Sequence, residues 1–128
     1  MNTLTLPTVT TDIAPELLEQ YAAEQQIVVI IEVEPISWAS YAVYVDPKIR
    51  LIDPTTGAEA RLVTAANVSL YPAMTIVDRM EGPAHLVFTT LPKSSQRFDL
   101  IEPKRPNLNP WRIPGIERNR TDVYRVKV

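Results

Sequence analysis

Apolar and polar positions alternate with a period of two along much of the chain, which is typical of β-strands with one buried face. In the segment 26–34, QIVVIIEVE, every odd position is Ile or Val. The even positions change from Val28 and Ile30 to Glu32 and Glu34. This pattern predicts a strand that is covered on both faces where it begins and exposed on one face where it ends.

The segment 40–46, SYAVYVD, alternates in the same way, with Tyr41, Val43 and Val45 on one face. It is followed by KIRLIDPTTGAEARLV (48–63), in which two short alternating runs flank the sequence Asp-Pro-Thr-Thr-Gly. Pro54 fixes its own φ angle, and Gly57 is available for a positive φ, so this segment predicts a β-hairpin.

A second hairpin is predicted for HLVFTTLPKSSQRFDLIE (85–102), where PKSSQ supplies a polar connection between two alternating runs. On the apolar phase of the predicted strands, eight residues are expected to share one core: Val29, Ile31, Tyr41, Val43, Leu86, Phe88, Phe98 and Leu100.

Four further segments are candidate strands: Thr3–Val9, Met74–Val77, Trp111–Pro114 and Val123–Val128. Twelve prolines and only three glycines separate these short runs, a spacing that favours a sandwich or barrel over alternating strands and helices. The prediction is an all-β chain, a single antiparallel β-sandwich domain over residues 1–128 with about seven to nine strands. One short helix is predicted near residues 15–25, where Pro15 suits a first helical position, although a connection between strands could hold the same residues.

The composition agrees with one globular domain, since 45% of the 128 residues are apolar and 22% are charged. No apolar run approaches the roughly 20 residues needed to cross a bilayer, so no membrane span is predicted. The start, MNTLTLPTVTTD, shows no signal-peptide pattern, and a location in the cell envelope or periplasm is expected only for a processed product.

Charge is distributed unevenly, because residues 1–64 hold nine acids and three bases whereas the remainder holds six acids and ten bases. The C-terminal bases Arg118, Arg120, Arg125 and Lys127 are therefore predicted to form a docking patch for a protein partner. The alternative is that they protect an edge strand from unwanted pairing. A nucleic-acid partner is disfavoured, because the overall balance is acidic and few aromatic residues lie among the bases.

The order of these segments resembles an Ig-like β-sandwich module found in uncharacterised proteins of Bacteroidetes-type bacteria. The resemblance runs from VVIIEVEP through the 48–63 hairpin to WRIPGIE, and it includes Phe88, the Leu-Pro-Lys joint at 91–93 and Asp-Leu-Ile-Glu at 99–102. It implies an Ig-like fold in a module that is often exported and sometimes precedes a thioredoxin-like domain. Since this chain has no Cys, the resemblance implies no redox role here.

Few residues suggest catalysis or metal binding. Without Cys, no thiol chemistry or thiolate metal site is possible, and His85 is the only histidine. Asp99 and Glu102 are three residues apart on one predicted strand, so they are expected to point to opposite faces and not to form a carboxylate pair. A calcium site that includes Asp46 and Asp53 is disfavoured, because no dense Asp/Asn/Gly loop surrounds them. No catalytic residue, metal or cofactor is predicted.

Three classes of function remain, and a non-catalytic binding or interaction module of unknown protein partner is preferred because folding accounts for every strong signal. The second is a small-ligand or carbohydrate binder that uses exposed aromatic residues, with Trp38 and Trp111 as the predicted ligand-binding residues and Tyr44 and Tyr71 as further candidates. Either Trp could instead fill the core or cover its open end. An enzyme is the least favoured class.

Overall fold

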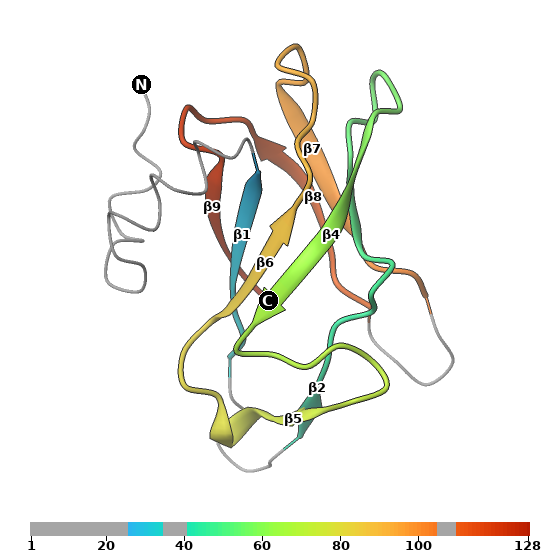
Figure 1. Ribbon diagram of the computed structural model, residues 1–128. Coiled ribbons are helices and arrows are strands. Elements are labelled where there is room, and N and C mark those ends of the chain that lie inside the picture. Colours follow the sequence, from blue (N-terminus) through green and yellow to red (C-terminus); the bar gives the residue numbers. More distant parts are fainter. Residues whose placement is uncertain (1–25, 35–40, 105–109) are drawn as a thin grey trace.

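The computed structural model describes residues 26–34, 41–104 and 110–128, and these segments form an all-β structure (Figure 1). The all-β prediction is confirmed. The predicted strand Thr3–Val9, the predicted helix near residues 15–25 and Trp38 lie outside the described residues. Nine strands and one 3-10 turn make up the described part of the chain: β1 (Ile27–Glu32), β2 (Ala42–Val43), β3 (Arg50–Ile52), β4 (Glu59–Ala66), β5 (Thr75–Ile76), η2 (Val77–Arg79), β6 (Ala84–Phe88), β7 (Arg97–Ile101), β8 (Arg112–Glu117) and β9 (Val123–Lys127).

Seven of these strands form one curled sheet in the order β8-β7-β3-β4-β6-β1-β9, and β2 and β5 form a small separate sheet at one end (Figure 1). The large sheet curls into a half-barrel, so its two halves face each other across the core, which matches the predicted sandwich only roughly. One pairing departs from the antiparallel prediction, because β1 and β9 run parallel.

The β3–β4 hairpin has the predicted turn. Gly57 adopts a φ of 81°, and its N–H donates to the carbonyl oxygen of Asp53 at 2.7 Å. The Asp53 carboxylate accepts the Thr55 N–H at 2.8 Å, as Asp commonly does at the start of a turn. The turn therefore depends on local chemistry that is visible in the sequence.

The second predicted hairpin is wrong, because β6 and β7 are strands but do not pair with each other. β6 pairs with β1 and β4, whereas β7 pairs with β3 and β8. The β3–β4 hairpin thus lies between them, and the order β7-β3-β4-β6 is that of a Greek key, in which the fourth strand returns beside the first. The segment 89–96 crosses the end of the half-barrel instead of making a tight turn.

The core lies inside the curl and contains six of the eight predicted residues: Val29, Ile31, Leu86, Phe88, Phe98 and Leu100. The prediction is wrong for Tyr41 and Val43, which are only partly buried and lie outside the core cluster. Both belong to the region of the small sheet, where Val43 pairs with Thr75 and the Tyr41 carbonyl accepts the Val77 N–H. The chain enters the core two residues later, at Val45.

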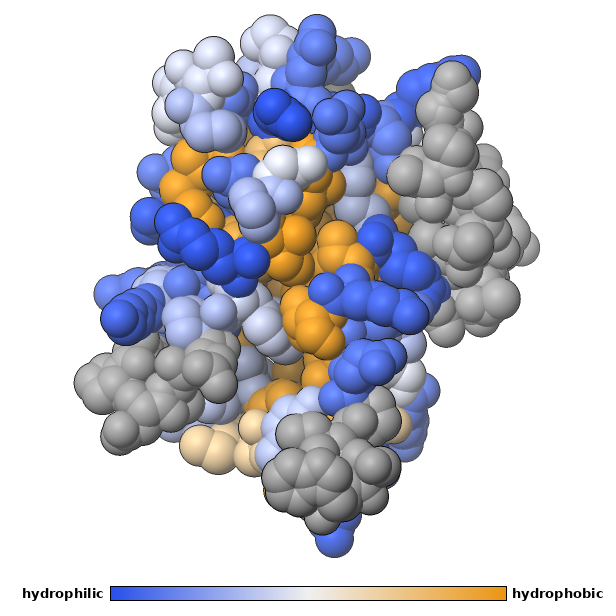
Figure 2. Space-filling view, turned by 180° about the vertical axis from the view of Figure 1, so that it is seen from behind, coloured by the Kyte–Doolittle hydropathy of each residue, from blue (hydrophilic) through white to orange (hydrophobic). Residues whose placement is uncertain are grey.

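The opposite face of the sheet is also buried around β1, as the apolar even positions of that strand predicted. Val28 and Ile30 are fully buried, and so is Val123 on the neighbouring strand β9. On the side away from β4 and β6, Figure 2 shows a band of hydrophobic residues that reaches the surface between hydrophilic side chains.

Strand β8, at one edge of the sheet, is unsuited to pairing with another strand. Pro114 has no N–H to donate, and Gly115 adopts a φ of 68° where the register with β7 shifts. The Gly115 N–H donates to the Asp99 carboxylate at 2.8 Å instead of to a backbone carbonyl. This bulge limits edge-to-edge association of the sheet.

The core assignment predicts that Phe88→Ala lowers the free energy of unfolding by about 3–5 kcal/mol, because it leaves a cavity at a fully buried position. Chemical denaturation measures this change. Val63→Ala is the control, since Val63 is 52% exposed on β4 and its loss should cost less than about 0.5 kcal/mol. An unchanged midpoint for Phe88→Ala would show that this residue is not part of the core.

Candidate functional site

The four C-terminal bases predicted to form a docking patch occupy two kinds of environment. The side chains of Arg118 and Arg125 are each only 13% exposed and form ion pairs with Asp122 and Glu32. Arg120 and Lys127 are exposed. The structure therefore leaves two of the four side chains accessible to a partner and uses the other two inside the molecule.

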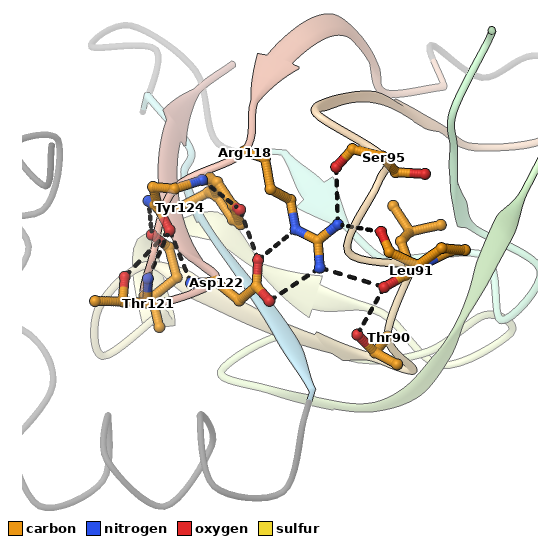
Figure 3. Close-up of polar contacts among 10 residues, drawn as sticks. Thr90, Leu91, Ser95, Arg118, Thr121, Asp122 and Tyr124 are labelled. Carbon is orange, nitrogen blue, oxygen red and sulfur yellow. Dashed lines mark hydrogen bonds and ion pairs between the residues drawn. The ribbon is translucent and has the colours of Figure 1, made fainter. Parts of the chain in front are cut away.

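Arg118 is the centre of a partly buried polar cluster in the link between β8 and β9 (Figure 3). Its Nε and Nη2 atoms donate to the two carboxylate oxygens of Asp122 at 2.6 and 3.1 Å, which is a bidentate ion pair. The remaining donors reach the connection between β6 and β7, where the carbonyl oxygens of Pro92 and Ser95 accept at 2.9 Å and that of Leu91 at 3.3 Å. One side chain thus joins two loops that are distant in sequence.

Asn119 and Tyr124 complete this cluster. The Asn119 side-chain oxygen accepts the N–H groups of Thr121 and Asp122 at 3.1 and 2.7 Å, which supports the positive φ of 55° at Asp122. The Tyr124 hydroxyl donates to Asp122 at 2.7 Å and accepts the Asn119 N–H at 3.0 Å. The Tyr124 ring also packs edge-on against Phe98, with centroids 5.1 Å apart, so the cluster is anchored to the core.

Two groups of this cluster have raised pKa values. Burial raises the pKa of the Tyr124 hydroxyl, and the hydrogen bond to Asp122 raises the pKa of the Arg118 guanidinium. Both groups stay protonated at neutral pH and therefore cannot act as a general base there. The contacts of the Arg118 side chain fix the link between β8 and β9.

A second polar cluster, which is buried, lies at the opposite end of the half-barrel, around Glu102. This carboxylate is 8% exposed and accepts the backbone N–H groups of Asp46 and Trp111 at 2.7 and 2.9 Å. Asp46 is 1% exposed, and its own carboxylate accepts the Lys48 N–H at 2.8 Å. Both carboxylates therefore hold backbone segments in place.

Trp111, predicted to bind a ligand, is partly buried and packs against the core. This position agrees with the alternative reading, in which the indole covers the open end of the core. Its use in ligand binding stays a prediction.

The other carboxylates considered from the sequence are separated. Asp99 holds the Gly115 bulge on the outer face of the sheet, away from Glu102. Asp53 is buried in the β3–β4 turn, where the Ser95 hydroxyl and the Thr55 N–H lower the pKa of its carboxyl group. Within the described segments, no three His, Cys, Asp or Glu residues lie close enough together to hold a metal ion.

His85 lies on the face of β6 opposite the core, between Ile30 of β1 and Ala66 of β4. Its Nε2 atom is buried without a hydrogen-bond partner among the described residues, and burial lowers the pKa of the imidazole. No carboxylate or nucleophile orients the ring in the described structure, so its position gives no support to a catalytic role.

An exposed apolar patch was not identified from the sequence. It consists of Leu70, Tyr71, Met74 and Ile76, which are between 37% and 56% exposed and lie on the β4–β5 connection and on β5. The sequence offers one signal, because NVSLYPAMTIV (67–77) is rich in apolar residues but does not alternate as a half-buried strand does. We call these four residues the apolar patch.

A shallow hollow of about 290 Å³ is lined by Glu32, Val33, Val77, Met80, Gly82 and Pro83. Among the described lining residues Glu32 is the one charged residue, and it is paired with Arg125.

No protein-family model, curated protein or solved structure matches this chain. No helix in the described segments is long and apolar enough to cross a membrane.

The Arg118 cluster predicts that Arg118→Met lowers the free energy of unfolding by about 2–4 kcal/mol, because the Asp122 carboxylate loses its ion pair and three carbonyl groups each lose one hydrogen bond. The control is Arg97→Met, which removes an exposed ion pair with Glu117 and should cost less than about 1 kcal/mol. Urea denaturation of both variants measures the difference. Equal losses would mean that Arg118 does not fix the link.

The lowered pKa of the His85 imidazole predicts that the protein loses stability in mild acid. Since its folded pKa lies below the ordinary value of 6.5, the unfolded chain binds the proton more readily. Stability is therefore complete above pH 6.5 and falls as the pH decreases from there through the folded pKa. Urea denaturation of the wild type and of His85→Leu between pH about 7.5 and about 5 tests this, and the variant should lose much less stability than the wild type. Parallel curves would assign the acid sensitivity to other groups.

Proposed function

We propose that this protein is a non-catalytic interaction module that docks another protein through the apolar patch. The observation that carries the proposal is the concentration of exposed apolar side chains. Of the six large hydrophobic residues that are exposed in the described structure, four belong to the short segment from Leu70 to Ile76. Grouped exposed apolar residues of this kind mark interaction sites more often than scattered ones do.

The backbone beneath the patch is held in place. Val45 bonds to this segment on both sides of Leu70, because its N–H donates to the Ser69 carbonyl and its carbonyl accepts the Tyr71 N–H, both at 2.9 Å. The hydroxyl groups of Ser69 and Thr75 are 2.7 Å apart and join the two ends of the loop. A fixed loop has less conformational entropy to lose on binding, so these contacts support recognition by the apolar patch.

The chemistry of the apolar patch favours a protein over a carbohydrate. Three of its members, Leu70, Met74 and Ile76, are aliphatic and cannot bond to sugar hydroxyl groups. Tyr71 is the aromatic member, and its ring lies 5.1 Å from that of Tyr44 at a tilt of 50°. A carbohydrate-binding role based on such rings is the second candidate, and an Ig-like module of the cell envelope would suit either role.

The triple variant Leu70→Ser, Met74→Ser, Ile76→Ser is expected to lose its partner, because the desolvated contact area disappears. Quantitative affinity capture from the native host, with full-length protein as bait, should show partner recovery lower by at least about tenfold. The control is Val63→Ser with Val128→Ser, which removes exposed apolar side chains elsewhere and should leave recovery unchanged.

Both variants should keep the melting temperature of the wild type, because the substituted residues are exposed. Equal recovery by the triple variant and the wild type would contradict docking through the apolar patch. Specific retention on a glycan array that Tyr71→Ala abolishes would favour the carbohydrate-binding alternative instead.

A further inference from the structure

Three arginines lie in one row across the outer face of the large sheet. Arg112 of β8 is opposite Ile101 of β7, Ile101 is opposite Arg50 of β3, and Arg50 is opposite Arg61 of β4. Residues directly opposite one another share a face, and this face is turned away from the core because the alternate positions Leu51, Ala60 and Leu100 are buried inside. We call Arg112, Arg50 and Arg61 the arginine row.

Arg50 and Arg61 form the closer of the two kinds of antiparallel pair. The Arg61 N–H and carbonyl group bond to Thr89 on the other side of β4, at 2.9 and 2.8 Å, and therefore not to Arg50. In such a non-hydrogen-bonded pair the Cα atoms are about 4.5 Å apart and the side chains are nearest each other. Like charges directly opposite destabilise a sheet, so folding alone does not account for this pair.

Two carboxylates of the described residues, Glu59 and Asp99, lie on the same face beside the row, one pair further along the strands, and Asp99 already accepts the Gly115 N–H. Glu59 lies 3.8 Å from Arg50 in an exposed ion pair, and Arg61 and Arg112 are exposed without an ion pair in the described structure. At the same end of the sheet, Glu102 and Asp46 are buried and accept backbone N–H groups.

More bases lie at this end of the sheet. Lys48 lies two residues before the start of β3, and Lys104 lies three residues after the end of β7; both are exposed. Since β3 and β7 are antiparallel, these two ends are adjacent, and the lysines add to the positive field of the arginine row.

We infer that the arginine row is a docking surface for an acidic segment of another protein. The row crosses four strands, so it spans about 14 Å, the length of four to five extended residues. Ile101 lies within the row and offers an apolar contact between the charges. Carboxylates placed along such a segment would neutralise the Arg50–Arg61 repulsion, which gives binding a favourable term that the free protein lacks.

A protein fits this surface better than a nucleic acid does. The row has no aromatic side chain on which a base could stack, and Trp111, the aromatic neighbour of Arg112 in sequence, packs against the core. The arginine row and the apolar patch share no residue, and the inference does not depend on the function proposed above.

The test uses purified full-length protein and a fluorescein-labelled hexaglutamate peptide, with binding followed by fluorescence anisotropy at low ionic strength. The variant Arg50→Ser, Arg61→Ser, Arg112→Ser should bind at least about tenfold more weakly than the wild type. The matched control, Arg79→Ser, Arg120→Ser, Lys127→Ser, removes the same charge from exposed positions elsewhere and should change the Kd by less than about threefold. The control also includes the two accessible bases of the predicted C-terminal patch.

The melting temperature provides an independent readout. If Arg61 served only the fold, its replacement would lower the melting temperature. The single variant Arg61→Ser should bind the peptide more weakly and yet melt at the same or a higher temperature, since it relieves the repulsion from Arg50.

If the two triple variants bound the peptide equally weakly, the effect would be one of net charge, and the inference would be overturned. Weaker peptide binding by the control alone would also overturn it. A single-stranded DNA oligomer that binds the arginine row more tightly than the peptide would overturn it in favour of a nucleic acid. A lower melting temperature for Arg61→Ser with unchanged peptide binding would show that Arg61 serves folding.

Discussion

The bidentate ion pair between Arg118 and Asp122 fixes the short link that joins the two edges of the half-barrel. β8 and β9 are the two edges of the seven-stranded sheet, yet residues 118–122 alone connect them along the chain. So short a link forces the edges toward each other at one end, and the sheet must curl. Arg118 fixes the link to the β6–β7 connection, while Tyr124 ties it to Phe98 in the core. The short link therefore brings the two edges together, and these few side chains hold it against the β6–β7 connection and the core.

Buried and exposed charged side chains have different roles in this molecule. The buried carboxylates, Glu102 and Asp53 among them, accept backbone N–H groups at places where the chain leaves the regular ladders. Such groups satisfy backbone donors that the sheet leaves without partners. The arginine row and the apolar patch satisfy no such requirement, and the fold would lose little without them. Residues that a fold does not need are where recognition by other molecules is best sought.

Much of the fold could be predicted from the sequence because strand formation and turn chemistry are local. Asp53 and Gly57 specified the β3–β4 hairpin, and alternation placed Phe88 and Leu100 correctly in the core. Alternation does not say which strand is the partner, so the β6–β7 pairing was wrong. It also does not say where a strand enters the core, which is why Tyr41 was placed there in error.

The site was harder to predict, because its geometry is made by contacts between distant segments. Arg118 looked like a surface base in the sequence, and only the folded β6–β7 connection supplies the carbonyl groups that bind it. The arginine row depends on the register of four strands, of which the sequence determined only the β3–β4 pair.

The parallel pairing of β1 with β9 affects the order in which the strands can pair during synthesis. β1 is the first described strand, but both of its neighbours, β6 and β9, come from the second half of the chain. During synthesis β1 is made before β6 and β9, so its continuous apolar run, Ile27–Ile31, is at first unpaired. An unpaired apolar run of this kind is prone to aggregation. Long-range pairings of this kind slow folding, so this apolar strand stays exposed in the incomplete chain for longer than a strand of a local hairpin does.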